Sequence, residues 1–197
     1  MPIRPDMMVY KNNDSLRPGF EITRNYEDGV RETKIHMNVH TGTHIDAPMH
    51  MIEGGSGIDT YPLGNMIAPC IVCDFTHLKE KITADDLRGQ PIKRGEFVLF
   101  KTRNSYENEF IPHFVYLDKT GAEYLAEVGV NGVGLDALSI ERSQPGHATH
   151  IALLSRGIAI IEGLRLKDVD QGSYTMVACP LNLVGVEASP ARVILMA

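Results

Sequence analysis

Short stretches of alternating apolar and polar residues punctuate the chain, and these predict β-strands. Between residues 32 and 44 the odd positions Ile35, Met37 and Val39 are apolar, while the even positions are polar, which is the period of a strand. Compact apolar runs bounded by glycine, proline or charged residues predict the other strands, at 69–75, 97–100, 130–135, 158–161, 174–178 and 192–196.

Helical patterns lie between these strands. Thr83 followed by two aspartates is typical of a helix start. Residues 118–128 predict a helix that ends at Gly129, and residues 147–156 predict one that ends at Gly157. Residues 1–30 are rich in proline, glycine, asparagine and aspartate, so we expect loop there. The alternation of helix and strand favours an α/β fold with a mixed β-sheet.

Composition narrows the class of protein. The 197 residues are 43% hydrophobic and 22% charged, which fits a single globular domain over residues 1–197. The net charge is -6 and no lysine or arginine cluster stands out, so neither nucleic acid nor an anionic membrane is expected as a partner. The chain has no apolar stretch near the roughly 20 residues that cross a bilayer and no secretory pattern at its start, so we expect a cytoplasmic protein.

The three cysteines fit a reducing compartment better than a disulfide framework. Cys70 and Cys73 form a C-x-x-C pair within a predicted strand, where an odd offset sends side chains to opposite faces. No second pair exists to complete a zinc site, so we interpret both as packing residues.

The candidate chemistry concentrates in the segment 40–50, HTGTHIDAPMH, which holds three of the eight histidines. On a helix, Asp46 would lie about 200° round from His44. On an extended segment, His40, His44, Asp46 and His50 share even parity and face the same way. Gly42 and Pro48 also argue against a helix.

Imidazole nitrogens and a carboxylate presented to one point predict a site for a divalent metal such as zinc, manganese or iron. Gly42 allows close approach of the backbone, and Thr41 and Thr43 can orient the ligands. A lone strand histidine is more often a surface or hydrogen-bonded residue, but three histidines and an aspartate on one face are rare by chance. His36 has the same parity one step further out, and we interpret it as a non-ligand.

Segment 40–50 resembles the signature of the cyclase family of metal-dependent hydrolases, which includes bacterial kynurenine formamidases and isatin hydrolases. Residues 132–139, GVGLDALS, are similar to a strand-to-loop segment of that family. Residues 150–154 and 157–164 are similar to its distal ligand region. The resemblance extends along most of the chain and implies a swivelling β/β/α-like fold.

By this resemblance, His40, His44 and Asp46 hold one metal ion, and Asp46 reaches a second ion that His150 and Glu162 complete. His50 matches a catalytic histidine that carries protons without binding metal. Zinc is the first expectation for the ion, with manganese as the alternative. His147 is either a supporting or a solvent-facing residue, and Asp136 either supports a ligand histidine or caps the loop that follows it.

The resemblance implies an enzyme that hydrolyses carbon–nitrogen bonds other than peptide bonds, here N-formyl-L-kynurenine to kynurenine and formate. Two alternatives stay open: a cyclic-amide hydrolase of the isatin type, and a metal- or ligand-binding module without turnover. A small-molecule amide is the expected partner, and a homodimer or higher homo-oligomer the expected assembly.

The chain has no tryptophan, so an aromatic wall for the substrate must come from residues such as Phe20, Tyr61, Phe110 or Tyr116. We expect the loop 103–110 and the loop around Phe20 to line the pocket. Chains of this family usually have a short strand before a proline-rich segment like residues 2–5, and the printed sequence begins at that segment.

Overall fold

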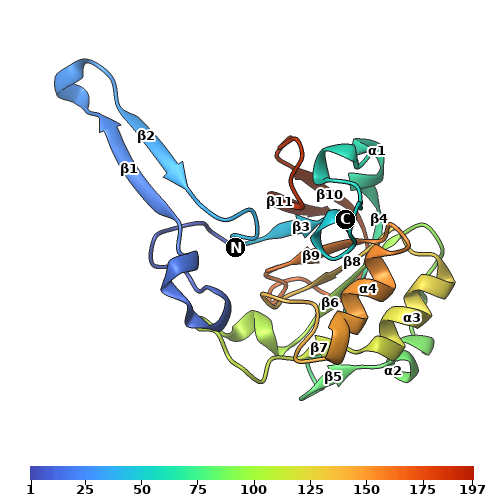
Figure 1. Cartoon of the computed structure of the whole chain (residues 1–197). Helices are drawn as coiled ribbons and strands as arrows, with labels where there is room; N and C mark the ends of the chain where they lie inside the picture. The colour runs from blue at the N-terminus through green and yellow to red at the C-terminus, as the bar shows by residue number, and fades with distance from the viewer.

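The computed structural model, which describes residues 1–197, is built around a closed barrel of seven strands (Figure 1). Around the barrel the order is β10, β11, β3, β9, β8, β6, β4, and β10 then pairs with β4 to close the ring. The strands are β3 (His44–Asp46), β4 (Ile67–Asp74), β6 (Phe97–Lys101), β8 (Gly132–Leu135), β9 (Ala159–Glu162), β10 (Gly172–Pro180) and β11 (Ala188–Met196).

The barrel combines both kinds of strand pairing. Three neighbouring pairs of strands are parallel: β4 with β6, β6 with β8, and β8 with β9. β3, β10 and β11 join antiparallel and complete the ring. The predicted α/β fold with a mixed sheet is therefore confirmed, and the closure of that sheet into a barrel is a feature that the local pattern did not indicate.

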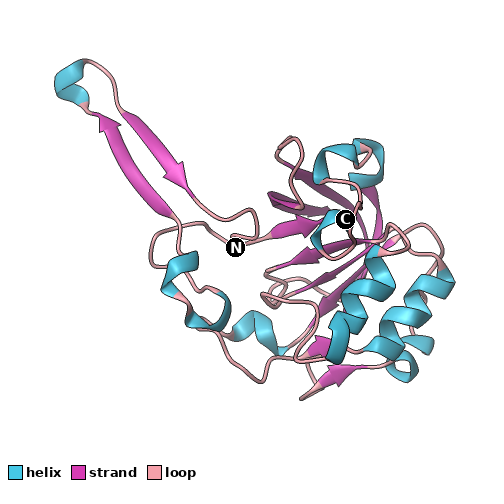
Figure 2. Ribbon diagram, in the orientation of Figure 1, coloured by secondary structure: helices cyan, strands magenta, loops and turns pink.

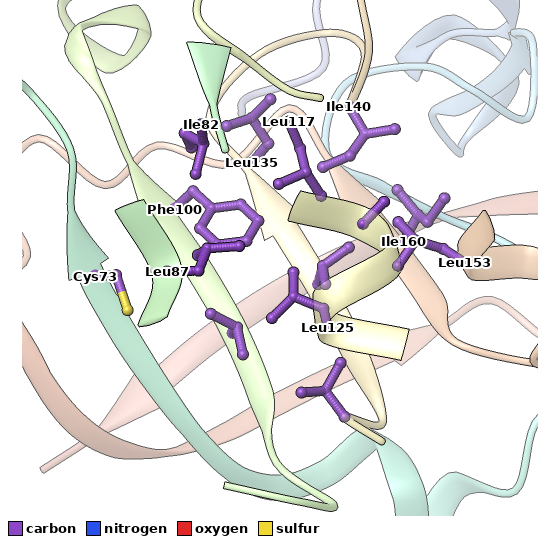
Figure 3. Packing of buried hydrophobic residues seen from close by; sticks show 14 of the residues in the cluster. Cys73, Ile82, Leu87, Phe100, Leu117, Leu125, Leu135, Ile140, Leu153 and Ile160 are labelled. Carbon is purple, nitrogen blue, oxygen red and sulfur yellow. The ribbon is translucent and has the colours of Figure 1, made fainter. Parts of the chain in front are cut away.

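Alternate residues of the strands face two separate apolar cores. On β4, Cys70 and Val72 lie in the core inside the barrel, whereas Ile71 and Cys73 lie in the core outside it. Both cysteines are buried on opposite faces, as the strand parity predicts. The outer core is the larger, and Figure 3 shows Phe100, Leu125 and Leu153 meeting there between strands and helices.

Three helices cover the outer core: α2 (Ala84–Arg88), α3 (Lys119–Val128) and α4 (Ala148–Leu154). Thr83 caps α2 by accepting from the Asp86 amide, and Asp118 caps α3 by accepting from the Gly121 amide. Gly129 ends α3 in the left-handed conformation at φ 79°, which glycine adopts at little cost. The predicted positions of these three helices are confirmed to within a few residues.

Shorter elements complete the chain. They are the helix α1 (Leu63–Met66), the strand pair β5 (Lys81–Ile82) and β7 (Tyr116–Leu117), and the 3₁₀ turns Tyr10–Asn12, Asp14–Leu16, Tyr26–Asp28, Pro48–His50, Ile58–Thr60, Arg103–Tyr106 and Pro145–His147. No helix in the structure has both the length and the apolar character that a membrane crossing requires.

A two-stranded hairpin, β1 (Gly19–Arg24) and β2 (Glu32–His36), projects from the barrel (Figures 1 and 2). We call residues 19–36 the arm. All eleven strand residues of the arm are exposed, and the two strands pair only with each other. The expectation that residues 1–30 form only loop is therefore wrong, because β1 lies within them; its register depends on a partner strand further along the chain.

Candidate metal centre

The segment 40–50 folds in three pieces rather than as one extended strand. Only His44 to Asp46 form a strand, β3. Gly42, at φ 69°, turns the chain between His40 and β3, and Pro48 begins a 3₁₀ turn that carries His50. The prediction of a single extended face is therefore wrong for His40 and His50, but it holds for His44 and Asp46.

The strand register places Glu162 beside the histidine motif. His44 on β3 pairs directly with Glu162 at the end of β9. Side chains of directly opposite residues lie on the same face of a sheet and within contact distance. His44 Nε2 lies 3.4 Å from Asp46 Oδ1 and 3.5 Å from Glu162 Oε2.

Gly163 makes this close approach possible. Its φ is 68°, and a Cβ at this position would collide with the carbonyl oxygen of Gly42. The neighbouring Thr43 hydroxyl donates to the Gly163 carbonyl at 2.7 Å. The backbone on both sides of the cluster is therefore tied together.

The remaining predicted residues converge on the same point. His40 Nδ1 lies 3.0 Å from Asp46 Oδ1, and His150, from α4, places Nε2 3.4 Å from Glu162 Oε1. The ring of His50 lies 4.4 Å from that of His40 and 5.6 Å from that of His150, measured between ring centres. The structure thus brings all six predicted site residues together, and it leaves His36 on the arm, paired with Glu21 at 3.2 Å.

Burial and charge act in opposite directions on the groups of this cluster. Burial alone would lower the pKa of His44, but the adjacent Asp46 carboxylate raises it to about 9. Burial would raise the pKa of Asp46, but His44 and His40 hold it well below its usual range. For His50 burial prevails over the attraction of Asp46, and its pKa is lowered.

The buried polar atoms of the cluster test whether it fits a metal ion. Both carboxylate oxygens of Asp46 and Nε2 of His44 are buried and make no hydrogen bond, although neighbouring polar atoms lie 3.0–3.5 Å away. Buried polar groups normally find a partner, since leaving one unsatisfied costs about 1–3 kcal/mol. Nitrogen and oxygen atoms that face a common point are the donor set that zinc and manganese take. The residues fit such an ion.

A cavity of about 340 Å³ opens onto the cluster, within the range of small-molecule sites. Five of the predicted site residues line it: His40, His44, His50, His150 and Glu162. The other lining residues are Glu141, His147 and a mostly apolar or neutral set: Met8, Val9, Tyr10, Leu16, Asn38, Thr41, Gly42, Met51, Leu138, Ser139, Ser143 and Gln144.

None of the four residues predicted for the aromatic wall, Phe20, Tyr61, Phe110 and Tyr116, lines this cavity. Phe20 lies on the arm, and the loop 103–110 lines a separate small depression through Phe110. Tyr10 is the aromatic residue that lines the cavity, with its ring packed edge-on against Phe110 at 5.2 Å. The opening residues carried no periodic pattern that could have indicated this position.

Glu141 is a site residue that the sequence reasoning missed. Its carboxylate is buried, lines the cavity, and lies 2.7 Å from His147 Nδ1 and 3.1 Å from His150 Nδ1. Glu141 follows β8, next to β9, so both strands deliver a carboxylate at the same edge of the barrel. A single glutamate in the loop after β8 carries no periodic or spacing signal that could have indicated it.

Asp136 caps a loop rather than supporting a ligand histidine. Its carboxylate accepts from the Thr102 amide, from the hydroxyls of Thr102 and Ser105 and from the Asn104 amide group. Neither role expected for Asp136 is observed, because its carboxylate holds the loop that follows β6 and not the loop that follows Asp136 itself.

Comparison with known proteins assigns the chain to a family. Residues 1–142 match the family model described as "Putative cyclase". A kynurenine formamidase of Salinibacter ruber is 32% identical over 98% of this chain and 93% of its own length. The solved structure of a predicted metal-dependent hydrolase from Bacillus stearothermophilus is 51% identical, with a TM-score of 0.91 over 99% of this chain and 94% of that one.

Isatin hydrolase A from Labrenzia aggregata shares the fold, with a TM-score of 0.85 and 23% identity over 100% of this chain and 91% of that one. The motif in segment 40–50, the barrel and these similarities agree. The chain belongs to the cyclase family.

Proposed function

We propose that this chain is a metal-dependent amide hydrolase that cleaves N-formyl-L-kynurenine to kynurenine and formate. The observation that carries the proposal is the cluster of His40, His44, Asp46, His150 and Glu162 beside one cavity, with buried polar atoms that make no hydrogen bond. Relatives named kynurenine formamidase, about 30% identical over nearly the whole chain, support the substrate class.

Two overlapping sets of residues would hold the metal. His40, His44 and Asp46 would bind one ion, and Asp46, His150 and Glu162 a second. The absence of cysteine from both sets favours a catalytic site over a closed structural one. Zinc fits the mixed imidazole and carboxylate donors, and manganese is the alternative.

A bound divalent ion supplies Lewis acidity and makes hydroxide available near neutral pH. His50 would take the proton released from the attacking water and deliver it to the departing nitrogen as the carbon–nitrogen bond breaks. Its ring packs close to those of both His40 and His150, and His50 lines the cavity, which supports this role. The products are a carboxylic acid and an amine, which balances one water consumed.

The shape of the cavity supports a small aromatic amide. Tyr10, Leu16 and Met51 offer apolar contact for an aryl ring, and Ser139 and Ser143 offer hydrogen bonds. An aniline leaving group also needs less protonation than an alkyl amine, so one proton-carrying histidine is sufficient.

The test is a rate assay on the zinc- and manganese-loaded protein with N-formyl-L-kynurenine and isatin as parallel substrates. The proposal expects formate release, with kcat/KM higher for the formamide. Preferential opening of isatin would favour the cyclic-amide alternative, and tight metal binding without turnover of either would favour a binding module.

We also propose that the chain functions as a homo-oligomer, and the arm supports this. Phe20 and Ile22 on β1 pair with Ile35 and Thr33 on β2, so one face of the arm is apolar and solvent-exposed. The chain exposes 10157 Å², about 900 Å² more than a compact monomer of its mass. A stable interface buries about 800 Å² per partner, so a second copy would account for the excess.

A cytoplasmic location remains our proposal, supported by the cysteines. Cys70, Cys73 and Cys179 are all free thiols, and Cys179 is exposed. Free thiols persist in reducing compartments.

A further inference from the structure

Glu141 is a buried carboxylate with an unusual number of partners. It is 4% exposed and lies in the loop between β8 and α4. One oxygen, Oε2, accepts from the Thr149 amide at 2.9 Å and from the His150 amide at 3.4 Å. This oxygen therefore holds the first turn of α4.

The other oxygen, Oε1, faces two imidazole rings. His147 Nδ1 lies 2.7 Å away in a hydrogen bond. His150 Nδ1 lies 3.1 Å away, at ion-pair distance but off the line of a hydrogen bond, and this nitrogen is buried with no other partner. Holding α4 requires only Oε2, so the position of Oε1 needs another explanation.

The two nitrogens of His150 face different groups. Nδ1 faces Glu141, and Nε2 lies 3.4 Å from Glu162 Oε1 on the side of the cluster. A neutral imidazole carries its proton on one nitrogen and offers a lone pair on the other, and a neighbouring acceptor decides which. A carboxylate at Nδ1 would keep the proton there and leave the Nε2 lone pair free.

The backbone conformation of His147 also favours a role for Glu141 Oε1. His147 adopts φ 51°, a left-handed conformation that costs a non-glycine residue free energy. In this conformation its ring donates to the oxygen that faces His150. Glu141 Oε1 is thereby held in place from a second side.

We propose that Glu141 is a positioning residue, which fixes the ring of His150 so that Nε2 faces Glu162. This inference rests on the proposed function, in which His150 holds the second ion. Partners of this kind orient metal-binding histidines and tune their affinity, and their loss typically costs about 10–100-fold in metal affinity. Glu141 therefore affects the affinity for the second ion rather than for the first.

The experiment titrates metal-free protein with zinc, using a competing chelator to resolve two affinities, for the wild type and Glu141→Gln. We expect one of the two affinities, that of the site of His150, to fall about 10–100-fold in the variant, with the site of His40 and His44 nearly unchanged. Imidazole ¹H–¹⁵N correlation spectra of the zinc-loaded protein should show a proton on His150 Nδ1 in the wild type and lose that signature in the variant. The inference would be overturned if Glu141→Gln bound zinc with the same two affinities as the wild type and kept the His150 signature.

A matched control separates positioning from general loosening of α4. The Thr149 hydroxyl donates to the Leu117 carbonyl at 2.8 Å and accepts from Gln144, so Thr149→Val weakens this region but retains the Thr149 amide that donates to Glu141. We expect Thr149→Val to lower thermal stability while retaining both zinc affinities. An equal loss of zinc in Thr149→Val would mean that Glu141 acts only on the helix.

Two further outcomes keep the inference falsifiable. Glu141→Asp retains the charge, so it should recover part of the lost affinity and serves as the test variant if Glu141→Gln does not fold. Anomalous scattering from zinc between Glu141, His147 and His150 Nδ1 would make Glu141 a direct ligand and overturn a positioning role. If the wild type binds no zinc, the proposed function fails, which is distinct from failure of this inference.

Discussion

The metal centre and the arm depart from the usual distribution of polar and apolar groups in opposite directions. In the centre, Asp46 and His44 are buried with polar atoms that have no hydrogen-bond partner. On the arm, Phe20, Ile22 and Ile35 are 44%, 52% and 56% exposed on one face of an isolated hairpin. Each arrangement is unfavourable in the chain alone.

The difference indicates what each region binds. Buried unpaired lone pairs are stabilised by a cation, whereas exposed apolar side chains are stabilised by another apolar surface. The rigid barrel supports the centre, but nothing in the chain covers the arm. Changes in the centre should therefore alter chemistry and folding, and changes in the arm should alter assembly.

The largest effect is expected for Asp46→Ala, because Asp46 contributes to both proposed ion sites. Steady-state assays of N-formyl-L-kynurenine hydrolysis should show a fall in kcat/KM of about 10³-fold or more. Asp85→Asn, a change at an exposed aspartate of α2, is the control and should match the wild type. Near-normal turnover in Asp46→Ala would remove the centre from the mechanism.

His50→Ala should separate metal binding from proton transfer. We expect this variant to retain its metal, measured by elemental analysis, while kcat falls about 10²–10³-fold, because general acid–base catalysis contributes effects of this size. His77→Ala, at an exposed histidine outside the cavity, should change neither quantity. Full activity in His50→Ala would exclude a proton-carrying role.

Gly163→Ala tests the close backbone contact beneath the centre. The added methyl group would collide with the Gly42 carbonyl and force a left-handed conformation, so we expect the free energy of unfolding to fall by about 2–3 kcal/mol. Gly29→Ala is a matched control: Gly29, at the arm tip, has φ 78° but no atom within 4 Å of its Cβ position. Equal losses in the two variants would mean that backbone conformation alone, without packing, explains the effect.

Substitutions on the arm should have the smallest effect on folding but a clear effect on assembly. The double change Phe20→Glu and Ile35→Glu should convert the oligomer to a monomer in light scattering coupled to size-exclusion chromatography. The free energy of unfolding of the monomer should change by no more than about 0.5 kcal/mol, since the arm packs on nothing in its own chain. Glu21→Gln, on the opposite face, should leave assembly intact; a wild type that is already monomeric would contradict the role of the arm.

The sequence predicted most of the helices and strands because their signals are local. Thr83 and Gly129 mark helix ends, and the apolar run that contains Cys70 and Cys73 marks a buried strand. β1 was missed because its residues are mixed in character and its pairing with β2 crosses the turn at Tyr26–Asp28. Closure of the barrel depends on β10 pairing with β4, about a hundred residues apart, which no local pattern encodes.

The six candidate site residues could be named from the motif and from the family resemblance, but the way in which they meet could not. Strand parity accounts for His44 and Asp46 alone. His40 and His50 reach the cluster through a glycine turn and a 3₁₀ turn, and Glu162 through its register with His44. Glu141 escaped notice because a single glutamate in a loop carries no spacing signal, and Tyr10 because the opening segment has no periodicity.

The most direct test of the central claim is a zinc titration of the metal-free wild type against Asp46→Ala by calorimetry. We predict tight, saturable zinc binding by the wild type and loss of that binding in the variant, because Asp46 carries the buried oxygens that make no hydrogen bond. Absence of saturable binding by the wild type, or equal binding by Asp46→Ala, would contradict it.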